Sequence, residues 1–65
     1  MLHMYNPNIY IEIQRPYTVV VMDGDKTYTH TYDRKSKAEP KAIELAKNSG
    51  VFCYFDHYKN SMIYL

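Results

Sequence analysis

Alternation of apolar and polar residues dominates the first half of the chain. Isoleucine recurs at every second position over 9–14, which is typical of a strand with one buried face. Two further strand-like runs, 17–22 and 27–33, are separated by Asp23-Gly24-Asp25. Glycine readily adopts the positive φ that tight hairpin turns require, so a two-residue turn centred on Asp23-Gly24 or Gly24-Asp25 is expected. The pattern predicts three strands, of which the last two form a β-hairpin.

A helical period follows the hairpin. Small apolar side chains recur at helical spacing over 37–49, and the run 36–39 (Ser-Lys-Ala-Glu) matches a capping box. Gly50 stands where a glycine commonly follows a helix C-terminus. Pro40 disfavours helical geometry at the residue before it. We therefore expect a helix that begins either near Lys37 or at Pro40 itself.

Two short apolar runs close the chain. Residues 51–55 are dense in aromatic and aliphatic side chains and predict a central strand, and 61–65 predict a last strand after a turn at 59–60. The order is β-β-β-α-β-β. The predicted fold class is α+β, an antiparallel sheet with one packed helix. We expect a single domain over 9–65, preceded by a flexible N-terminal arm over 1–8.

Period-2 geometry divides the predicted strands into two faces. On the hairpin, the face rich in valine and tyrosine has more apolar area, so we place it against the helix. The opposite face is expected to be exposed, or covered by something outside this fold. We assign this face, with two side chains of the last strand, to a protein-binding surface. Its predicted members are Thr18, Val20, Met22, Thr27, Thr29, Thr31, Met62 and Tyr64.

Size and composition favour a chain that works by binding. The 65 residues allow one domain, and a domain this small buries only roughly 60% of the surface of its unfolded chain. The single cysteine, Cys53, excludes an intramolecular disulfide and fits a cytoplasmic setting. Eight tyrosines and no tryptophan suit either a small core or a protein interface. A homodimer is therefore the expected additional source of stability.

Charge supplies the alternative hypothesis. The net charge is only +1, lower than is usual for a dedicated nucleic-acid binder. Four cations nevertheless gather at the predicted strand–helix junction, where backbone N–H groups also favour anions. They are a solvated loop or a phosphate-binding site for DNA or RNA, and their positions are Arg34, Lys35, Lys37 and Lys41.

Residues suited to catalysis or metal binding are few. Cys53, Asp56 and His57 are the nearest approach to a metal cluster, but on a strand Cys53 and His57 would lie about 13 Å apart. Nucleophiles with a base at motif spacing do not occur in the sequence. No apolar run approaches the roughly 20 residues that a membrane helix needs. We therefore expect no enzyme activity, no metal, no cofactor and no membrane partner.

Two resemblances bear on function. The segment 17–50, with its run 17–21, its glycine turn and the residues 35–39 entering an alanine-rich helix, resembles three-stranded-sheet-plus-helix DNA-binding domains. These include the arm-binding domains of phage integrases and the plant ethylene-response-factor domain. In such domains the exposed sheet face enters the major groove and carries arginine and lysine. The corresponding face here has neither, which favours a protein partner.

The second resemblance covers 37–65, which is similar to small bacterial families of unknown function built as hairpin–helix–hairpin. In kind, the chain is similar to the small inhibitors that phages encode, which implies the host cytoplasm as its location. We therefore expect a small non-enzymatic protein-binding module, of the type that inhibits a host enzyme or defence complex. The alternatives are nucleic-acid binding through the basic junction and a structural subunit with no activity of its own.

Overall fold

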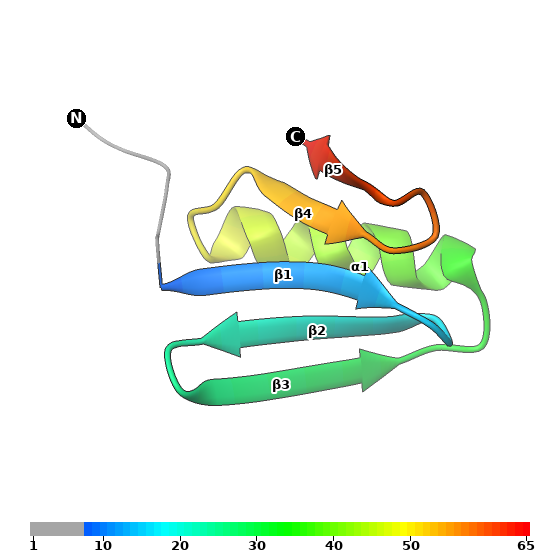
Figure 1. Cartoon of the computed structure of the whole chain (residues 1–65), viewed down its shortest axis with the longest axis horizontal. Coiled ribbons are helices and arrows are strands. Elements are labelled where there is room, and N and C mark those ends of the chain that lie inside the picture. Colours follow the sequence, from blue (N-terminus) through cyan, green and yellow to red (C-terminus); the bar gives the residue numbers. More distant parts are fainter. Residues whose placement is uncertain (1–7) are drawn as a thin grey trace.

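The structure, a computed structural model, describes residues 8–65 and contains five strands and one helix (Figure 1). They are β1 (Ile9–Gln14), β2 (Thr18–Asp23), β3 (Lys26–Thr31), α1 (Lys35–Asn48), β4 (Cys53–Asp56) and β5 (Ser61–Tyr64). The α+β class and the order β-β-β-α-β-β are confirmed. The predicted N-terminal arm, 1–8, lies outside the described residues except for Asn8.

The strands form one sheet in the order β3-β2-β1-β4-β5. Three of the four strand pairings are antiparallel, as predicted, but β1 and β4 pair in parallel, so the sheet is mixed rather than purely antiparallel. The helix is the reason for this correction. It carries the chain back along the sheet after β3, so that β4 enters beside β1 in the direction that both β3 and β1 follow.

The β2–β3 turn confirms one of the two predicted hairpin registers. Asp23 pairs with Lys26, which leaves Gly24 and Asp25 as the two central residues. Gly24 has a φ of +62°, as the first central position of a type II′ turn requires.

The helix begins earlier than predicted. Its N-cap is Arg34, which provides no side-chain cap, so Ser36 lies inside the first turn and the predicted capping box is wrong. Contacts of Lys35 with the sheet, described below, fix this earlier start. Pro40 lies within the helix rather than at its first position. At the other end Gly50 has a φ of +76°, confirming its predicted role beyond the C-terminus.

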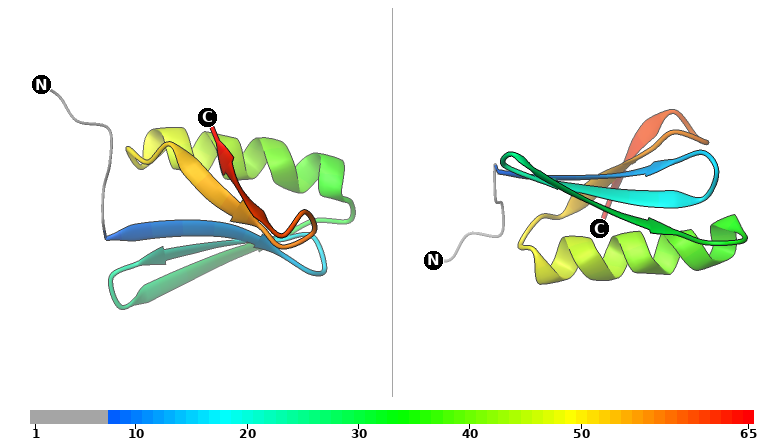
Figure 2. Two further views of the ribbon diagram at one scale, coloured as in Figure 1. Left: turned by 45° about the horizontal axis from the view of Figure 1, so that its top comes forward. Right: turned by 90° about the horizontal axis from the view of Figure 1, so that it is seen from below.

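Alanine sets the distance between helix and sheet. Ala38, Ala42 and Ala46 are fully buried against a core of aliphatic strand residues and Tyr54. Val19 and Val21 belong to that core, which confirms the predicted inner face of the hairpin. Figure 2 shows the result, a single helix covering one face of the sheet. Among residues 8–65 no segment covers the other face. No helix in this range is long and apolar enough to cross a membrane.

Candidate functional site

The uncovered side of the sheet, here named the open face, contains residues of all five strands. Its membership follows from the register, because side chains paired across neighbouring strands lie on the same face. Met22 pairs with Tyr10 and Thr27, and Phe55 pairs with Glu12 and Met62. The open face comprises Tyr10, Glu12, Gln14, Thr18, Val20, Met22, Thr27, Thr29, Thr31, Cys53, Phe55, Met62 and Tyr64. Every residue predicted for the protein-binding surface is therefore on one face.

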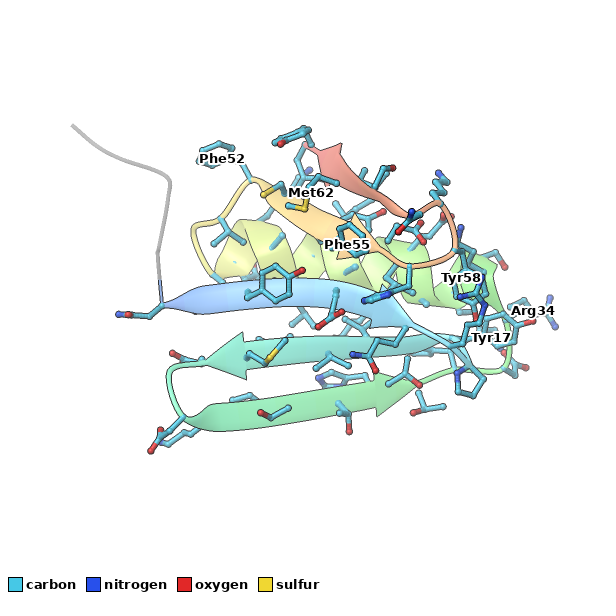
Figure 3. All side chains as sticks on the ribbon, viewed as in Figure 1. Tyr17, Arg34, Phe52, Phe55, Tyr58 and Met62 are labelled. Carbon is cyan, nitrogen blue, oxygen red and sulfur yellow. The ribbon has the colours of Figure 1, made fainter. Side chains whose placement is uncertain are left out.

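The open face has a hydroxyl-rich half and an aromatic half. Threonines line β3 and the adjoining end of β2, where the hydroxyls of Thr18 and Thr31 are hydrogen-bonded at 3.1 Å. The other half carries Tyr10 and Tyr64, which are 44% and 70% exposed. Figure 3 shows Phe55 on β4 beside Met62 on β5. The open face thus presents apolar and hydroxyl groups over most of its area, with no lysine or arginine among its members.

One acidic side chain sits within this face. The Glu12 carboxyl group is nine-tenths buried and contacts Nε2 of His57, whose backbone N–H donates to the Ile13 carbonyl at 3.0 Å. The Phe55 ring meets the His57 ring edge-on at 4.8 Å between centroids. Sequence analysis missed this group. Alternation along β1 puts Glu12 on the polar face, but its proximity to His57 depends on the parallel β1–β4 pairing.

Tyr10 remains a neutral phenol on this face. Partial burial raises the pKa of Tyr10 above its ordinary value, and the charges of Glu12 and Cys53 raise it further. A neutral hydroxyl group can both donate and accept a hydrogen bond, as it does in many interfaces.

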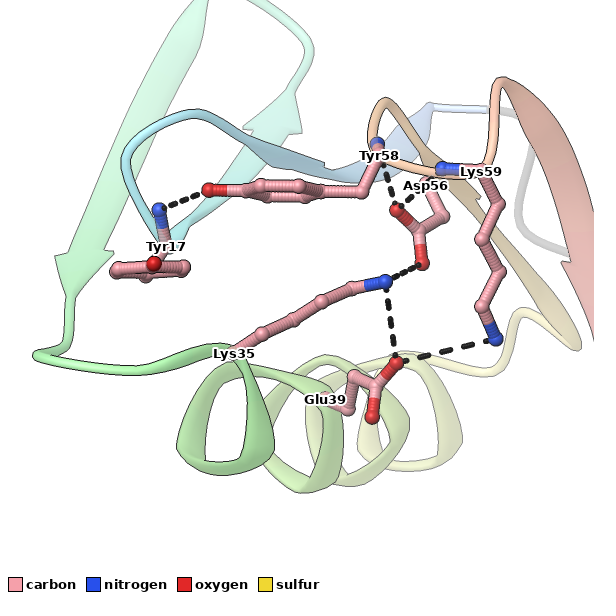
Figure 4. Close-up of polar contacts among 6 residues, drawn as sticks. All are labelled: Tyr17, Lys35, Glu39, Asp56, Tyr58 and Lys59. Carbon is pink, nitrogen blue, oxygen red and sulfur yellow. Dashed lines mark hydrogen bonds and ion pairs between the residues drawn. The ribbon is translucent and has the colours of Figure 1, made fainter.

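The basic junction, formed by Arg34, Lys35, Lys37 and Lys41, contains carboxylates beside its cations, unlike the predicted phosphate-binding site. Lys35 Nζ lies 3.2 Å from Asp56 Oδ2 and 3.5 Å from Glu39 Oε2, and Lys59 approaches Glu39 at 3.9 Å (Figure 4). Asp56 is fully buried, and its Oδ1 accepts backbone N–H bonds from Tyr58 at 2.8 Å and from Lys59 at 3.2 Å. Oδ2 has no well-aligned hydrogen bond within residues 8–65, so Lys35 is its ionic partner. Lys35 therefore attaches the helix to the β4–β5 turn.

The pKa values of Asp56 and Lys35 are each shifted by burial in one direction and by their partners in the other. Burial acts to raise the pKa of Asp56, but Lys35 and the two backbone N–H groups outweigh it, and the pKa is lowered. Burial likewise acts to lower the pKa of Lys35, but Asp56 and then Glu39 outweigh it, and that pKa is raised. Both groups are therefore charged near neutral pH.

The other three cations also face carboxylates. Lys37 lies 3.1 Å and Arg34 3.8 Å from Asp33, and Lys41 lies 3.6 Å from Glu44. These pairs are more exposed, so each contributes little to stability and exchanges readily with solvent. The predicted basic residues thus share the junction with acidic partners and do not form a purely cationic surface.

An aromatic stack completes the junction. The rings of Tyr17 and Tyr58 are parallel at 5.7 Å, and the Tyr17 backbone N–H donates to the Tyr58 hydroxyl at 3.0 Å. Arg15 and Lys35 lie 4.6 and 5.0 Å from the centre of the Tyr58 ring. The stack connects the β1–β2 turn, which contains a cis Arg15–Pro16 peptide, to the β4–β5 turn. These aromatic groups therefore serve the fold, because the Tyr58 ring contacts Tyr17, Arg15 and Lys35 within the protein itself.

The three residues considered for metal binding are separated by the sheet. Asp56 is buried on the helix side, whereas Cys53 lies on the open face and His57 contacts Glu12 there. Within residues 8–65 no group of three or more histidine, cysteine or acidic side chains is arranged to hold a metal ion.

Comparison with protein-family models, with curated proteins and with solved structures finds no match to this chain.

Proposed function

We propose that this protein is a small non-enzymatic protein-binding module whose open face contacts a partner protein. The observation that carries the proposal is the uncovered sheet face itself. Contiguous apolar surface on a monomer commonly marks an interaction site. Tyrosine, methionine and phenylalanine are enriched in interfaces, whereas lysine is depleted there. The open face has this composition.

The charge of the open face defines the chemistry of the partner. Glu12 is paired with His57, and the remaining members are uncharged, so steering by strong electrostatic fields is not expected. A complementary partner presents an uncharged, largely apolar surface with hydrogen-bonding groups opposite the threonine hydroxyls. A broad, twisted sheet face of this kind (Figure 2) suits a folded protein surface better than a narrow peptide groove.

Site-directed crosslinking tests the proposal. A benzoyl-phenylalanine replacing Tyr10 on the open face is expected to crosslink the partner, whereas the same group replacing the exposed Glu44 on α1 is not. The captured protein would then be purified and titrated against wild type and Met22→Glu. The buried charge is expected to weaken binding by about tenfold or more, since an unpaired charge in an interface is costly.

A matched control is Glu44→Gln on the exposed surface of α1, which is expected to bind like wild type. Equal affinity of wild type and Met22→Glu for the purified partner, or crosslinking from position 44 alone, would exclude the open face as the binding surface.

The finer proposal is that the module acts as a phage-type inhibitor of a host enzyme or defence complex. Its support is the small size of the domain and a five-stranded open face that could cover the surface of a larger protein. If so, the purified partner is an enzyme or a subunit of a defence complex, and its activity falls upon addition of wild type but not of Met22→Glu. A partner whose activity is unchanged at saturation would leave binding without inhibition.

Nucleic-acid binding is the alternative, and the ion pairs of the junction count against it. Fluorescence anisotropy with DNA and RNA probes is expected to show no binding even at low salt, where electrostatic attraction is strongest. Lys35 forms an ion pair with buried Asp56, so replacing it would disturb the fold. The double variant Arg34→Ala plus Lys37→Ala removes two exposed cations instead and tests this alternative. Salt-sensitive binding that this double variant abolishes would favour nucleic acid over a protein partner.

A further inference from the structure

The strand β5 has the composition of an interior strand although it lies at an edge of the sheet. Its residues and the next one, 61–65, read Ser-Met-Ile-Tyr-Leu and contain no charge. Edge strands are normally protected by charged residues, proline or a bulge. Apolar residues on both faces are typical of a strand whose two faces are both covered, so β5 lacks the polar face of an ordinary solvated strand as well as the charges of an ordinary edge. We infer that the free edge of β5 pairs with β5 of a second copy of this chain.

Exposed apolar side chains gather around this edge on both faces. Tyr64, on the open face, is 70% exposed. On the helix side Phe52 and Leu65 are 45% and 44% exposed, and they line a shallow hollow with Val51, Gly50 and Lys47. The helix packs on β1, β2 and β4 and leaves this side of β5 half open. Both faces of the edge therefore retain apolar surface that a neighbouring strand would bury.

The backbone defines the register of the contact. Leu65 N–H donates to the Phe52 carbonyl at 2.9 Å, which makes 52 and 65 a hydrogen-bonded pair. Because such pairs alternate along an antiparallel ladder, the N–H and C=O groups of Met62 and Tyr64 point away from β4. No other strand within residues 8–65 lies on that side.

This arrangement is complementary to itself. In an antiparallel two-fold pairing, Met62 exchanges both main-chain hydrogen bonds with Tyr64 of the partner subunit, and Tyr64 does the same with Met62 of the partner subunit. Ile63 then lies across the axis from Ile63 of the partner subunit. Paired residues share a face, so both open faces lie on the same side of one continuous sheet. The dimer therefore enlarges the surface that the proposed function assigns to a partner protein.

The opposite edge is less suited to a second copy. The residues of β3 whose backbone groups point outward are Thr27, Thr29 and Thr31. Their side chains are short and polar, and Lys26 begins the strand. A polar edge of this kind specifies a register only weakly.

Two measurements on the full chain test the inference. Sedimentation equilibrium is expected to show a concentration-dependent dimer, and amide exchange followed by nuclear magnetic resonance is expected to show protection of Met62 and Tyr64 at dimer-forming concentrations. A chain that stays monomeric at all concentrations would overturn the inference. So would a dimer in which these amides exchange freely, or one that protects Thr27, Thr29 and Thr31 instead.

The matched variants are Tyr64→Pro and Tyr64→Thr. Proline removes the outward N–H while leaving the β4–β5 hydrogen bonds, and proline is tolerated on edge strands. Threonine removes the aromatic ring but keeps the N–H. We expect proline to weaken the dimer by about tenfold or more relative to threonine, through lost main-chain hydrogen bonds. Equal dimerisation of the two variants would overturn the inference. If Tyr64→Pro fails to fold by circular dichroism, the amide protection of wild type decides.

Partner binding and dimerisation can be tested separately, so failure of the proposed function is distinguishable from failure of this inference. Met22→Glu, on β2, lies far from the free edge of β5 and is expected to weaken partner binding while leaving the dimer intact. Loss of both would instead indicate that the open face, rather than the edge, forms the dimer.

Discussion

At the residue scale, Asp56 holds the β4–β5 turn against the first turn of α1. It is fully buried, and it contacts two other parts of the chain, the helix through Lys35 and the β4–β5 turn through the backbone of Tyr58 and Lys59. A buried carboxylate is costly unless its partners compensate for lost hydration. Here an ammonium group and two N–H donors do so.

We expect Asp56→Asn to destabilise the fold by about 1–3 kcal/mol at neutral pH, because Lys35 loses its buried ionic partner and keeps only Glu39, while the turn keeps an acceptor oxygen. Lys35 is 26% exposed, so water offsets part of the loss. Urea unfolding measures the change. Asp33→Asn is the control, since that carboxyl group is 62% exposed and its removal should cost less than about 0.5 kcal/mol.

The pH dependence of this difference has a definite sign. The folded-state pKa of Asp56 is lowered, so its contribution is fully present above the unfolded pKa, about 3.9, and is lost as the pH falls through the folded value. The pKa of Lys35 is raised, so its contribution is present below about pH 10 and is lost at higher pH. The gap between wild type and Asp56→Asn should therefore narrow in acid. A gap that is constant down to about pH 2 would contradict the ionic explanation.

At the scale of elements, α1 contains a proline that interrupts its own backbone hydrogen bonding. Pro40 lies in the sixth position of the helix and cannot donate a backbone hydrogen bond to Ser36. Its side chain is exposed, so no packing compensates for the missing bond. The helix persists because three alanines bury its inner face against the sheet.

We therefore expect Pro40→Ala to stabilise the protein by about 1–3 kcal/mol, by restoring the donor and improving helix propensity. Ser36→Ala should change stability by less than about 0.5 kcal/mol, because Ser36 does not cap the helix. Thermal and urea unfolding of the two variants separate these effects. A loss of about 1 kcal/mol in Ser36→Ala would instead support the capping box that the sequence predicts.

The same helix shows why local sequence patterns predict that an element is present better than they predict the residues at which it begins and ends. Gly50 and the hairpin glycine, Gly24, act through their own backbone conformation, so the sequence alone locates them. The first turn of α1 depends on Lys35 reaching Asp56, which is distant along the chain and close only in the fold. A capping motif could not reveal that contact, and the two predicted starts, Lys37 and Pro40, were two and five residues late.

At the scale of the whole molecule, period-2 alternation predicts which residues of the β2–β3 hairpin share a face, because both possible two-residue turns give the same parity. Thr18, Val20 and Met22 could thus be assigned to one surface from the sequence, whereas the place of Met62 on that surface depends on the β1–β4 and β4–β5 pairings. The parallel β1–β4 pairing, and with it the contact of Glu12 with His57, could not be assigned. Such pairings depend on long-range packing that short sequence windows do not contain.

Residues of the open face should contribute to partner binding but little to the stability of the fold. Two adjacent residues of β1, which point to opposite faces of the sheet, test this expectation. Tyr10 points to the open face and is 44% exposed, whereas Ile11 points to the helix and is 1% exposed. Ile11→Ala should cost about 2–5 kcal/mol through the cavity it leaves, but Tyr10→Thr should cost less than about 0.5 kcal/mol and still weaken partner binding. Urea unfolding and titration with the purified partner measure the two effects. A large stability loss in Tyr10→Thr would show that the open face supports the fold itself, and the surface proposed for the partner would lose its main argument.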